Sequence, residues 1–216
     1  MARVTIIMSV HGTGQWLPDA LASIPWELEP EVIVTANGFE EFDAVLEAAG
    51  GYQITTPLRP TTIPLSDSLN AMLSAASGDY VMRLDPDDKL PPGVLTEMLD
   101  VADATPKPAL VYGGFVDFGA RARVVRPLDA TIETLRNANP GGYNVLVDAD
   151  LARSIGGYQE VGYEDWHYLA RLVLAGAHWV RMERPTLLHR VRNDGRFADF
   201  SRTHADRLRA IREVLA

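Results

Sequence analysis

Two alternating patterns of apolar residues organise the first half of the chain. Short runs rich in β-branched or aromatic residues predict strands, at 3–10, 32–35, 53–56 and 80–84. Apolar side chains that recur at every third or fourth position predict helices, over 17–24, 42–49, 65–76 and 94–99. Strands that alternate with single helices pair in parallel through right-handed crossovers. This half is therefore predicted to form a doubly wound α/β sheet.

The second half follows a less regular pattern. Two strand-like runs, 109–118 and 122–126, predict a hairpin around Gly119 that adds antiparallel strands to the sheet. A loop is predicted at 137–142 and a helix over 166–173. The remaining predicted elements are strands at 178–182 and 186–191 and a helix with one apolar face over 200–216. No repeat or clear linker separates these elements, so the sequence predicts a single domain over residues 1–216.

Composition places the chain among ordinary globular proteins, with 216 residues, of which 47% are hydrophobic and 23% charged. The absence of cysteine excludes disulfides and thiolate metal sites and fits the reducing cytoplasm, where we expect the protein. No apolar run has the length of a transmembrane segment, and the first residues are typical of a strand rather than a signal peptide. The net charge of −9 disfavours stable binding to nucleic acid. Peripheral membrane contact remains open through basic residues near the C-terminus, namely Arg202, Arg207, Arg209 and Arg212.

Three carboxylates, Asp85, Asp87 and Asp88, follow the strand at 80–84 within four residues. Like charges this close repel one another, so the cluster costs folding free energy unless something offsets it. A divalent cation with oxygen ligands, Mn²⁺ or Mg²⁺, would do so. The alternative is a solvated acidic turn in which Asp88 caps the next helix. These residues alone leave both interpretations open.

Polar residues also follow two other predicted strands, His11–Gly14 after the first and Ala36–Gly38 after the second. In open α/β sheets, ligands bind beyond the carboxyl ends of the strands, so these segments and the acidic cluster should gather at one edge. Gly12 and Gly14 allow close backbone approach to a ligand. They form neither a complete dinucleotide fingerprint nor a phosphate loop, which would need a lysine.

A second acidic pair, Glu164 and Asp165, begins the helix that Trp166 continues. Acidic residues at a helix N-terminus interact favourably with the helix dipole, which is a sufficient structural reason for them. Alternatively, a carboxylate there could accept a proton from an incoming hydroxyl, with Gly156 and Gly157 allowing backbone close to a ligand. The residues themselves do not decide between these two roles.

Taken together, the ordered motifs resemble those of family 2 glycosyltransferases. In chain order they are Asn70 in a helix, Ser77–Tyr80, Asp85–Asp88, Gly156–Tyr158, Glu164–Trp166 and Pro185–Arg190. The resemblance runs from Val4 to about Arg192. It implies a GT-A-like, Rossmann-type, mostly parallel sheet with helices on both faces and a small antiparallel addition. It also implies a nucleotide-sugar-binding half, 1–115, and an acceptor-side half, 116–216.

The resemblance implies an inverting glycosyltransferase that needs Mn²⁺ or Mg²⁺ and takes a nucleotide-sugar donor, with an unknown acceptor. By residue, it assigns the catalytic base to Asp165, supported by Glu164. The implied metal ligands are Asp87, which binds directly, Asp85, which contacts either the ribose or the metal through water, and His189. The implied donor-binding residues are Val10, His11, Asn37, Asn70, Arg83, Asp85, Arg190 and Arg192. The implied acceptor-binding residues are Gly157, Tyr158 and Trp166.

Departures from the family pattern concentrate on the nucleotide side. Many relatives have an aspartate where this chain has Ala36-Asn37, so a preference for uridine does not follow. A histidine frequent in the closing motif is replaced by Arg192, which pairs with phosphate but does not bind metal. His189 either substitutes for it or fills a strand position. Two other functions stay open: a nucleotidyltransferase, although His11–Gln15 lacks the cation typical of that class, and a catalytically silent sugar-nucleotide-binding domain.

Overall fold

The computed structural model describes residues 3–38, 62–192 and 204–216. Between the first two ranges it also describes Asp43, Val45, Glu47, Tyr52 and Ile54–Thr55. The predicted helix over 42–49 is represented by Asp43, Val45 and Glu47, which are helical, and its other residues lie outside the described ones.

In the described part of the chain, the main sheet has seven strands in the order β3-β2-β1-β4-β8-β5-β9. They are β1 (Val4–Val10), β2 (Glu31–Ala36), β3 (Ile54–Thr55), β4 (Tyr80–Arg83), β5 (Ala109–Tyr112), β8 (Val145–Asp148) and β9 (His178–Arg181). The pairs β1–β2, β1–β4, β2–β3 and β5–β9 are parallel, whereas β8 runs antiparallel to both β4 and β5. The predicted mostly parallel α/β sheet is therefore confirmed.

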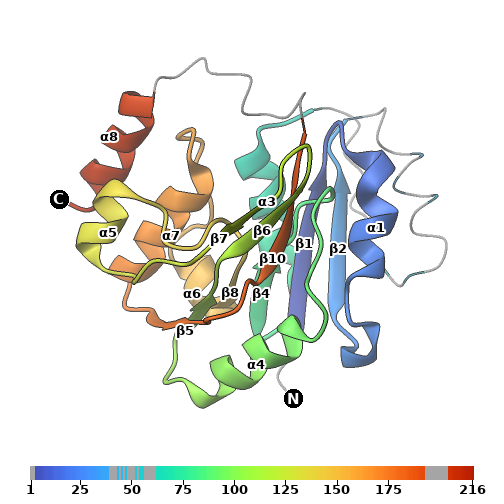
Figure 1. Ribbon diagram of the computed structural model, residues 1–216, viewed down its shortest axis with the longest axis horizontal. Coiled ribbons are helices and arrows are strands. Elements are labelled where there is room, and N and C mark those ends of the chain that lie inside the picture. Colours follow the sequence, from blue (N-terminus) through green and yellow to red (C-terminus); the bar gives the residue numbers. More distant parts are fainter. Residues whose placement is uncertain are drawn as a thin grey trace.

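Helices cover both faces of this sheet (Figure 1). They are α1 (Leu17–Ala22), α3 (Leu65–Ala75), α4 (Val94–Ala104), α5 (Ile132–Asn137), α6 (Ala149–Ser154), α7 (Glu164–Leu174) and α8 (His204–Val214). Side chains of β1 alternate between the two layers: Ile6 and Met8 pack in one core with α1 and α4. Ile7 packs in the other core with α3 and α7. This alternation explains why the strand is apolar at nearly every position.

A second sheet of three strands, again among the described residues, has the order β10-β6-β7. Its strands are β6 (Phe115–Gly119), β7 (Arg123–Val125) and β10 (Leu187–Val191). β6 pairs antiparallel with β7 and parallel with β10. Lys89 and Leu188 exchange backbone hydrogen bonds of 3.0 and 2.9 Å, so β10 lies against the chain that leaves the acidic turn.

The structure corrects several sequence predictions. The run 109–118 is not one strand, because it divides at Gly113 and Gly114 into β5 and β6, which belong to different sheets. A Cβ on Gly114 would lie 2.1 Å from the Val125 carbonyl, so only glycine at position 114 lets the chain pass from one sheet to the other there. The hairpin around Gly119 is confirmed, but it belongs to the small sheet and not to the main one.

Among the α-helices and strands of the described residues, α5, β8 and α6 were not predicted. The antiparallel strand of the main sheet is β8, and α6 begins directly after it because Asp148 accepts a hydrogen bond from Leu151 N–H at 3.2 Å. Within the described ranges, none of the helices combines the length and apolar character needed to cross a bilayer.

Candidate active site

The acidic turn follows the carboxyl end of β4. Its first carboxylate, Asp85, accepts two hydrogen bonds from the Arg83 guanidinium, from Nε at 2.7 Å and from Nη2 at 2.9 Å. This two-pronged contact is the strongest pairing that arginine makes with a carboxylate. Asp88 N–H donates to the Asp85 carbonyl at 3.0 Å and closes the turn. The turn is therefore held by its own backbone and by a cation from the preceding strand.

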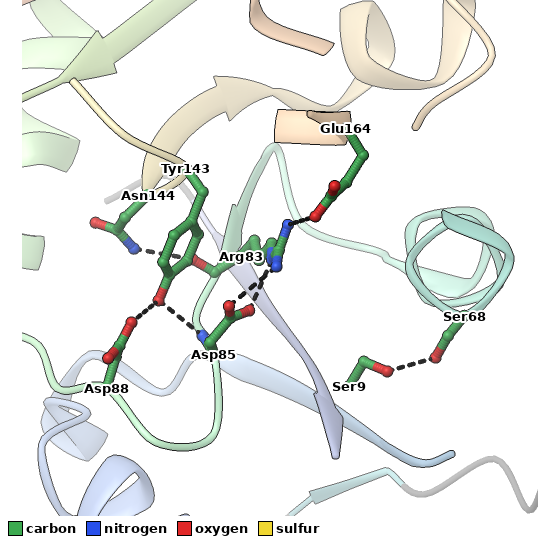
Figure 2. A network of polar contacts seen from close by, with 8 residues as sticks. All are labelled: Ser9, Ser68, Arg83, Asp85, Asp88, Tyr143, Asn144 and Glu164. Carbon is green, nitrogen blue, oxygen red and sulfur yellow. Dashed lines mark hydrogen bonds and ion pairs between the residues drawn. The ribbon is translucent and has the colours of Figure 1, made fainter. Parts of the chain in front are cut away.

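Arg83 also connects this turn to the start of α7. Its side chain is 6% exposed, and Nη1 donates to Glu164 Oε1 at 3.4 Å. The guanidinium carbon lies 4.7 Å from the centre of the Tyr143 ring, and Asn144 Nδ2 donates to the Arg83 carbonyl at 2.8 Å. Figure 2 shows the guanidinium between the Asp85 and Glu164 carboxylates. Two acidic segments some eighty residues apart thus meet at one buried cation.

Asp88 faces inward and is only 2% exposed. Its carboxylate accepts a hydrogen bond of 2.6 Å from the Tyr143 hydroxyl (Figure 2). It accepts a second one, also of 2.6 Å, from Arg190 N–H of β10. Burial, and next the charge of Asp85, raise the pKa of Asp88 to about 7. Asp88 therefore neither faces solvent nor caps α4, whose N-cap residue is Gly93. It links the acidic turn to the small sheet.

Asp87 keeps its side chain 16% exposed and forms an ion pair with Arg192, Nε to Oδ2, at 3.3 Å. Burial, and next the nearby Asp85, raise the pKa of Asp87. The guanidinium groups of Arg190 and Arg192 lie 5.5 and 4.9 Å from the centre of the Trp16 ring. Trp16 had no predicted role. Its position just beyond β1, at the edge where ligands bind, is the signal that could have identified it.

His189 lies in β10, where its Nδ1 is 2.8 Å from Asp117 Oδ1. Asp117 is buried and also accepts hydrogen bonds from Arg121 and Arg123. His189 thus fills a strand position with one ring nitrogen engaged. Among the residues that the structure describes, no three His, Asp or Glu side chains are already grouped as a metal site. The assignment of Asp85, Asp87 and His189 to a metal stays a prediction.

Glu164 and Asp165 stand in the first turn of α7. Asp165 Oδ2 accepts a hydrogen bond of 3.1 Å from Asn139 Nδ2. Burial, and next the charge of Glu164, raise the pKa of Asp165 to about 6, and the Arg83 cation opposes this rise. A carboxylate with a pKa near neutrality is suited to take a proton and release it again. Asn139 was predicted only as part of a loop.

Asn70 and Gly157, expected at the donor and acceptor respectively, contact each other. The Asn70 carboxamide accepts from Tyr158 N–H at 2.7 Å and donates to the Tyr158 carbonyl at 2.9 Å. A Cβ on Gly157, whose φ is +67°, would lie 2.1 Å from Asn70 Oδ1. The close approach that this glycine permits is therefore to a side chain of α3, which fixes the segment before α7.

Replacing Gly157 by alanine is expected to lower the free energy of unfolding by about 2 kcal/mol, because positive φ and the contact with Asn70 both oppose a side chain. Gly176→Ala is the matched control, since Gly176 has φ +91° but no atom near its missing Cβ. We expect about half the loss there in urea denaturation. An equal loss in both variants would contradict the importance of the Asn70 contact.

Asn37 has a carboxamide engaged in the same way as that of Asn70. It donates to the Ile63 carbonyl at 3.0 Å and accepts from Ile63 N–H at 2.9 Å, and the residue is 2% exposed. Its backbone N–H donates to the Val10 carbonyl, and its own carbonyl lies 3.0 Å from His11 Nδ1. The structure thus brings Val10, His11 and Asn37 together beyond β1 and β2.

Tyr158 and Trp166 are each 6% exposed. The Tyr158 ring stacks on Tyr168 with centroids 4.0 Å apart, and Trp166 Nε1 donates to the Leu135 carbonyl at 2.8 Å. Both aromatic residues pack in the core beneath α7. Their predicted contact with an acceptor remains a prediction.

A family profile decides the affiliation of the chain. The profile described as Glycosyl transferase family 2 matches residues 5–154, which is more than half of the sequence and includes the acidic turn. The chain belongs to glycosyl transferase family 2. The segment that matches the family ends before Glu164 and Asp165, so these two residues rest on the geometry described above.

Solved structures share the fold of this family 2 chain. TarS 1–349 of S. aureus in complex with UDP-GlcNAc has a TM-score of 0.80 at 14% identity, over 98% of this chain and 65% of TarS 1–349. The mannosyltransferase PcManGT of Pyrobaculum calidifontis, in complex with GDP-Man and Mn²⁺, has a TM-score of 0.70 at 19% identity, over 91% and 59%. An uncharacterised Sinorhizobium fredii protein, y4gI, is 28% identical over 58% of this chain and 14% of its own length. The chain thus spans less than two thirds of these relatives.

Proposed function

We propose that this family 2 chain is an inverting glycosyltransferase that moves a sugar from a nucleotide-sugar donor to an acceptor hydroxyl. One observation carries the proposal: the buried Arg83 pairs with Asp85 of the acidic turn and with Glu164 beside Asp165. A donor site and an acceptor site are useful to a transferase only when they adjoin, and this arginine joins them. The donor half, 1–115, and the acceptor-side half, 116–216, meet at this contact.

On the donor side, we assign Asp87, with Asp85 near it, to a divalent cation, Mn²⁺ or Mg²⁺. The residues fit such an ion, because Asp87 is partly exposed and its pKa is raised by burial and next by the charge of Asp85, so a cation would relieve the repulsion. Carboxylates with substrate phosphates are the usual ligands of these ions. When bound, the metal would neutralise charge on the leaving diphosphate. PcManGT, which shares the fold, was solved with GDP-Man and Mn²⁺.

Three basic side chains of β10 and its end also belong to the donor side in this proposal. Arg192 pairs with Asp87 in this structure, so a cation that binds Asp87 has to share or displace the guanidinium. Arg190 and Arg192 would then contact the donor diphosphate as fixed cations. His189 stays oriented by Asp117 through Nδ1, and its other ring nitrogen could bind the cation.

On the acceptor side, Asp165 takes the proton of the acceptor hydroxyl. The hydroxyl oxygen forms a bond to the anomeric carbon from the face opposite to the diphosphate, and the bond from that carbon to the diphosphate oxygen breaks. One displacement of this kind inverts the configuration. The raised pKa of Asp165 matches the requirement for a base that works near neutral pH. Glu164 keeps Arg83 in place beside it.

The two asparagines have supporting roles in the proposed site. The Asn37 carboxamide makes both of its hydrogen bonds to the backbone of Ile63, and the Asn70 carboxamide makes both of its own to the backbone of Tyr158. We therefore assign them to shaping the donor site rather than to reading the nucleotide base. Val10 and His11 remain our donor-side candidates from the first strand.

A thermal-shift experiment with UDP, GDP, UDP-GlcNAc and GDP-Man, each with Mn²⁺ and with EDTA, tests the proposal. At a hundredfold excess over Kd, a ligand stabilises the fold by about 2.7 kcal/mol, or roughly 5–10 °C for a chain of this size. The shift should be larger with Mn²⁺, and Asp87→Asn should lose the part that depends on Mn²⁺. The absence of a shift with every nucleotide would overturn the proposal.

A further inference from the structure

The loop between α5 and β8 contacts the proposed catalytic base. Asn139 lies in this loop, and its Nδ2 donates to Asp165 Oδ2 at 3.1 Å. The carboxamide oxygen of the same side chain accepts hydrogen bonds from Gly141 N–H at 3.2 Å and from Gly142 N–H at 3.0 Å. Both ends of the side chain are therefore engaged, and its NH₂ group is aimed at Asp165.

The sequence Asn139-Pro140-Gly141-Gly142 is suited to holding this side chain. An asparagine that accepts from the backbone two residues on forms its own turn, and proline fixes the backbone that follows. A Cβ on Gly141 would lie 2.6 Å from the Gly113 carbonyl, and Gly142 has φ +83°. The Pro140 carbonyl also accepts from Leu128 N–H at 2.8 Å. The turn is thus fixed on both sides of Asn139.

We propose that Asn139 is a positioning residue for Asp165, which orients the carboxylate toward the acceptor and favours its ionised form. The inference rests on the proposed function of Asp165. An ionised carboxylate has about four lone-pair positions, and the bond from Asn139 occupies one of them, so it restricts the rotation of the carboxylate. A donor to the charged form of an acid stabilises that form.

The charged and titratable groups around Asp165 come from three elements. Glu164 on α7 raises the pKa of Asp165, and Arg83 at the end of β4 lowers it. Tyr158, in the loop before α7, is buried close enough to interact electrostatically with Asp165. Asn139 is a neutral side-chain donor to Asp165, beside the backbone N–H groups of Trp166 and Asp165, which also favour the ionised form. Its removal should therefore destabilise the ionised carboxylate without changing the net charge of the site.

Two substitutions separate positioning from a role in the turn. Asn139→Asp keeps an oxygen that accepts from Gly141 and Gly142, but it replaces the donor to Asp165 by a second carboxylate. Asn139→Ala removes both. Asn137→Ala, two residues earlier and exposed at the end of α5, is the matched control. If Asn139 only builds the turn, Asn139→Asp should resemble the wild type. If Asn139 positions Asp165, Asn139→Asp should impair the site more than Asn139→Ala does.

The first measurement is the pKa of the Asp165 carboxyl group, followed through the ¹³C resonance of its carboxyl carbon in an NMR titration. The resonance is assigned by its loss in Asp165→Asn. We expect a rise of about 0.5–1 unit in Asn139→Ala, a larger rise in Asn139→Asp and none in Asn137→Ala. The second measurement is hydrolysis of the nucleotide sugar that gives the largest thermal shift, with Mn²⁺ and water as acceptor. Turnover should fall about tenfold in Asn139→Ala, with the acidic limb of its pH profile displaced upward.

An unchanged Asp165 titration and wild-type turnover in Asn139→Asp would overturn this inference. That outcome differs from failure of the proposed function, in which Asp165→Asn itself would retain turnover. Because the titration needs no substrate, it reports on the contact between Asn139 and Asp165 in either case.

Discussion

Replacing Asp165 by asparagine is expected to lower turnover by about 10²–10⁴-fold and to leave the affinity for donor nearly unchanged. Asparagine has the same shape, but it cannot take a proton from the attacking hydroxyl. The acidic turn and the arginines that we assign to the donor lie on other elements and are not altered. Single-turnover transfer or hydrolysis measures the loss, and titration with the nucleoside diphosphate measures donor affinity.

The same variant should be more stable than the wild type at pH 8. The pKa of Asp165 is raised from its ordinary value of 3.8 to about 6, so the folded protein disfavours the ionised carboxylate. Stability is therefore lost as the pH rises from about 4 through 6, where the unfolded chain binds fewer protons than the folded one. Asparagine does not have this cost. We expect the difference in melting temperature to shrink as the pH falls from 8 toward 4.

Glu164→Gln is the matched control for Asp165→Asn. It alters the adjacent residue of the same helical turn and removes a charge that raises the pKa of Asp165, but it leaves the proposed base. We expect a smaller loss of turnover and an acidic limb displaced to lower pH. Near-normal turnover in Asp165→Asn, with Glu164→Gln inactive, would move the base assignment to Glu164.

Arg83→Met is expected to lower the free energy of unfolding by about 3 kcal/mol or more. Methionine fills much of the volume, but it leaves the carboxylates of Asp85 and Glu164 without their shared cation while both stay partly buried. Removing one partner of a buried ion pair destabilises the fold by more than the intact pair stabilises it, because the remaining charge keeps its desolvation penalty. Urea denaturation at pH 7 measures the effect.

Arg83→Lys keeps the charge and serves as the control. An ammonium group cannot reproduce the two-pronged bond to Asp85, so we expect an intermediate loss. The double variant Arg83→Met with Asp85→Asn should recover part of the stability that Arg83→Met loses, which a double-mutant cycle detects. If the two substitutions are simply additive, the pairing of Arg83 with Asp85 does not hold the turn.

The sequence predicted the strands that lie deep in the sheet and missed those defined by distant partners. β1 and β4 are apolar runs buried on both faces, so their composition alone identifies them. β8 is equally buried and no shorter than β4, but its antiparallel direction depends on contacts with β4 and β5. The division of 109–118 depends on the Val125 carbonyl that approaches Gly114, which no local pattern indicates.

For the site, the order of the motifs predicted the acidic turn and Asp165, but not the side chains that hold them. From the sequence, Arg83 could equally have pointed into solvent, and the structure places it in the interior between two carboxylates. Tyr143 and Asn139 contact residues 55 and 26 positions away along the chain. Such partners follow from the folded path of the chain and have no signature in the residues themselves.

The backbone hydrogen bonds made by the carboxamides of Asn37 and Asn70 have a consequence for the entropy of ligand binding. Asn37 and Asn70 each bond both backbone polar groups of one residue in a neighbouring loop, Ile63 and Tyr158. Ile63 and Tyr158 therefore lose conformational freedom when the protein folds, at roughly 1–2 kcal/mol per fixed residue, and not when a ligand arrives. The backbone at Ile63 and Tyr158 is thus preorganised, so ordering of these two residues should subtract little from the affinity for a donor or an acceptor.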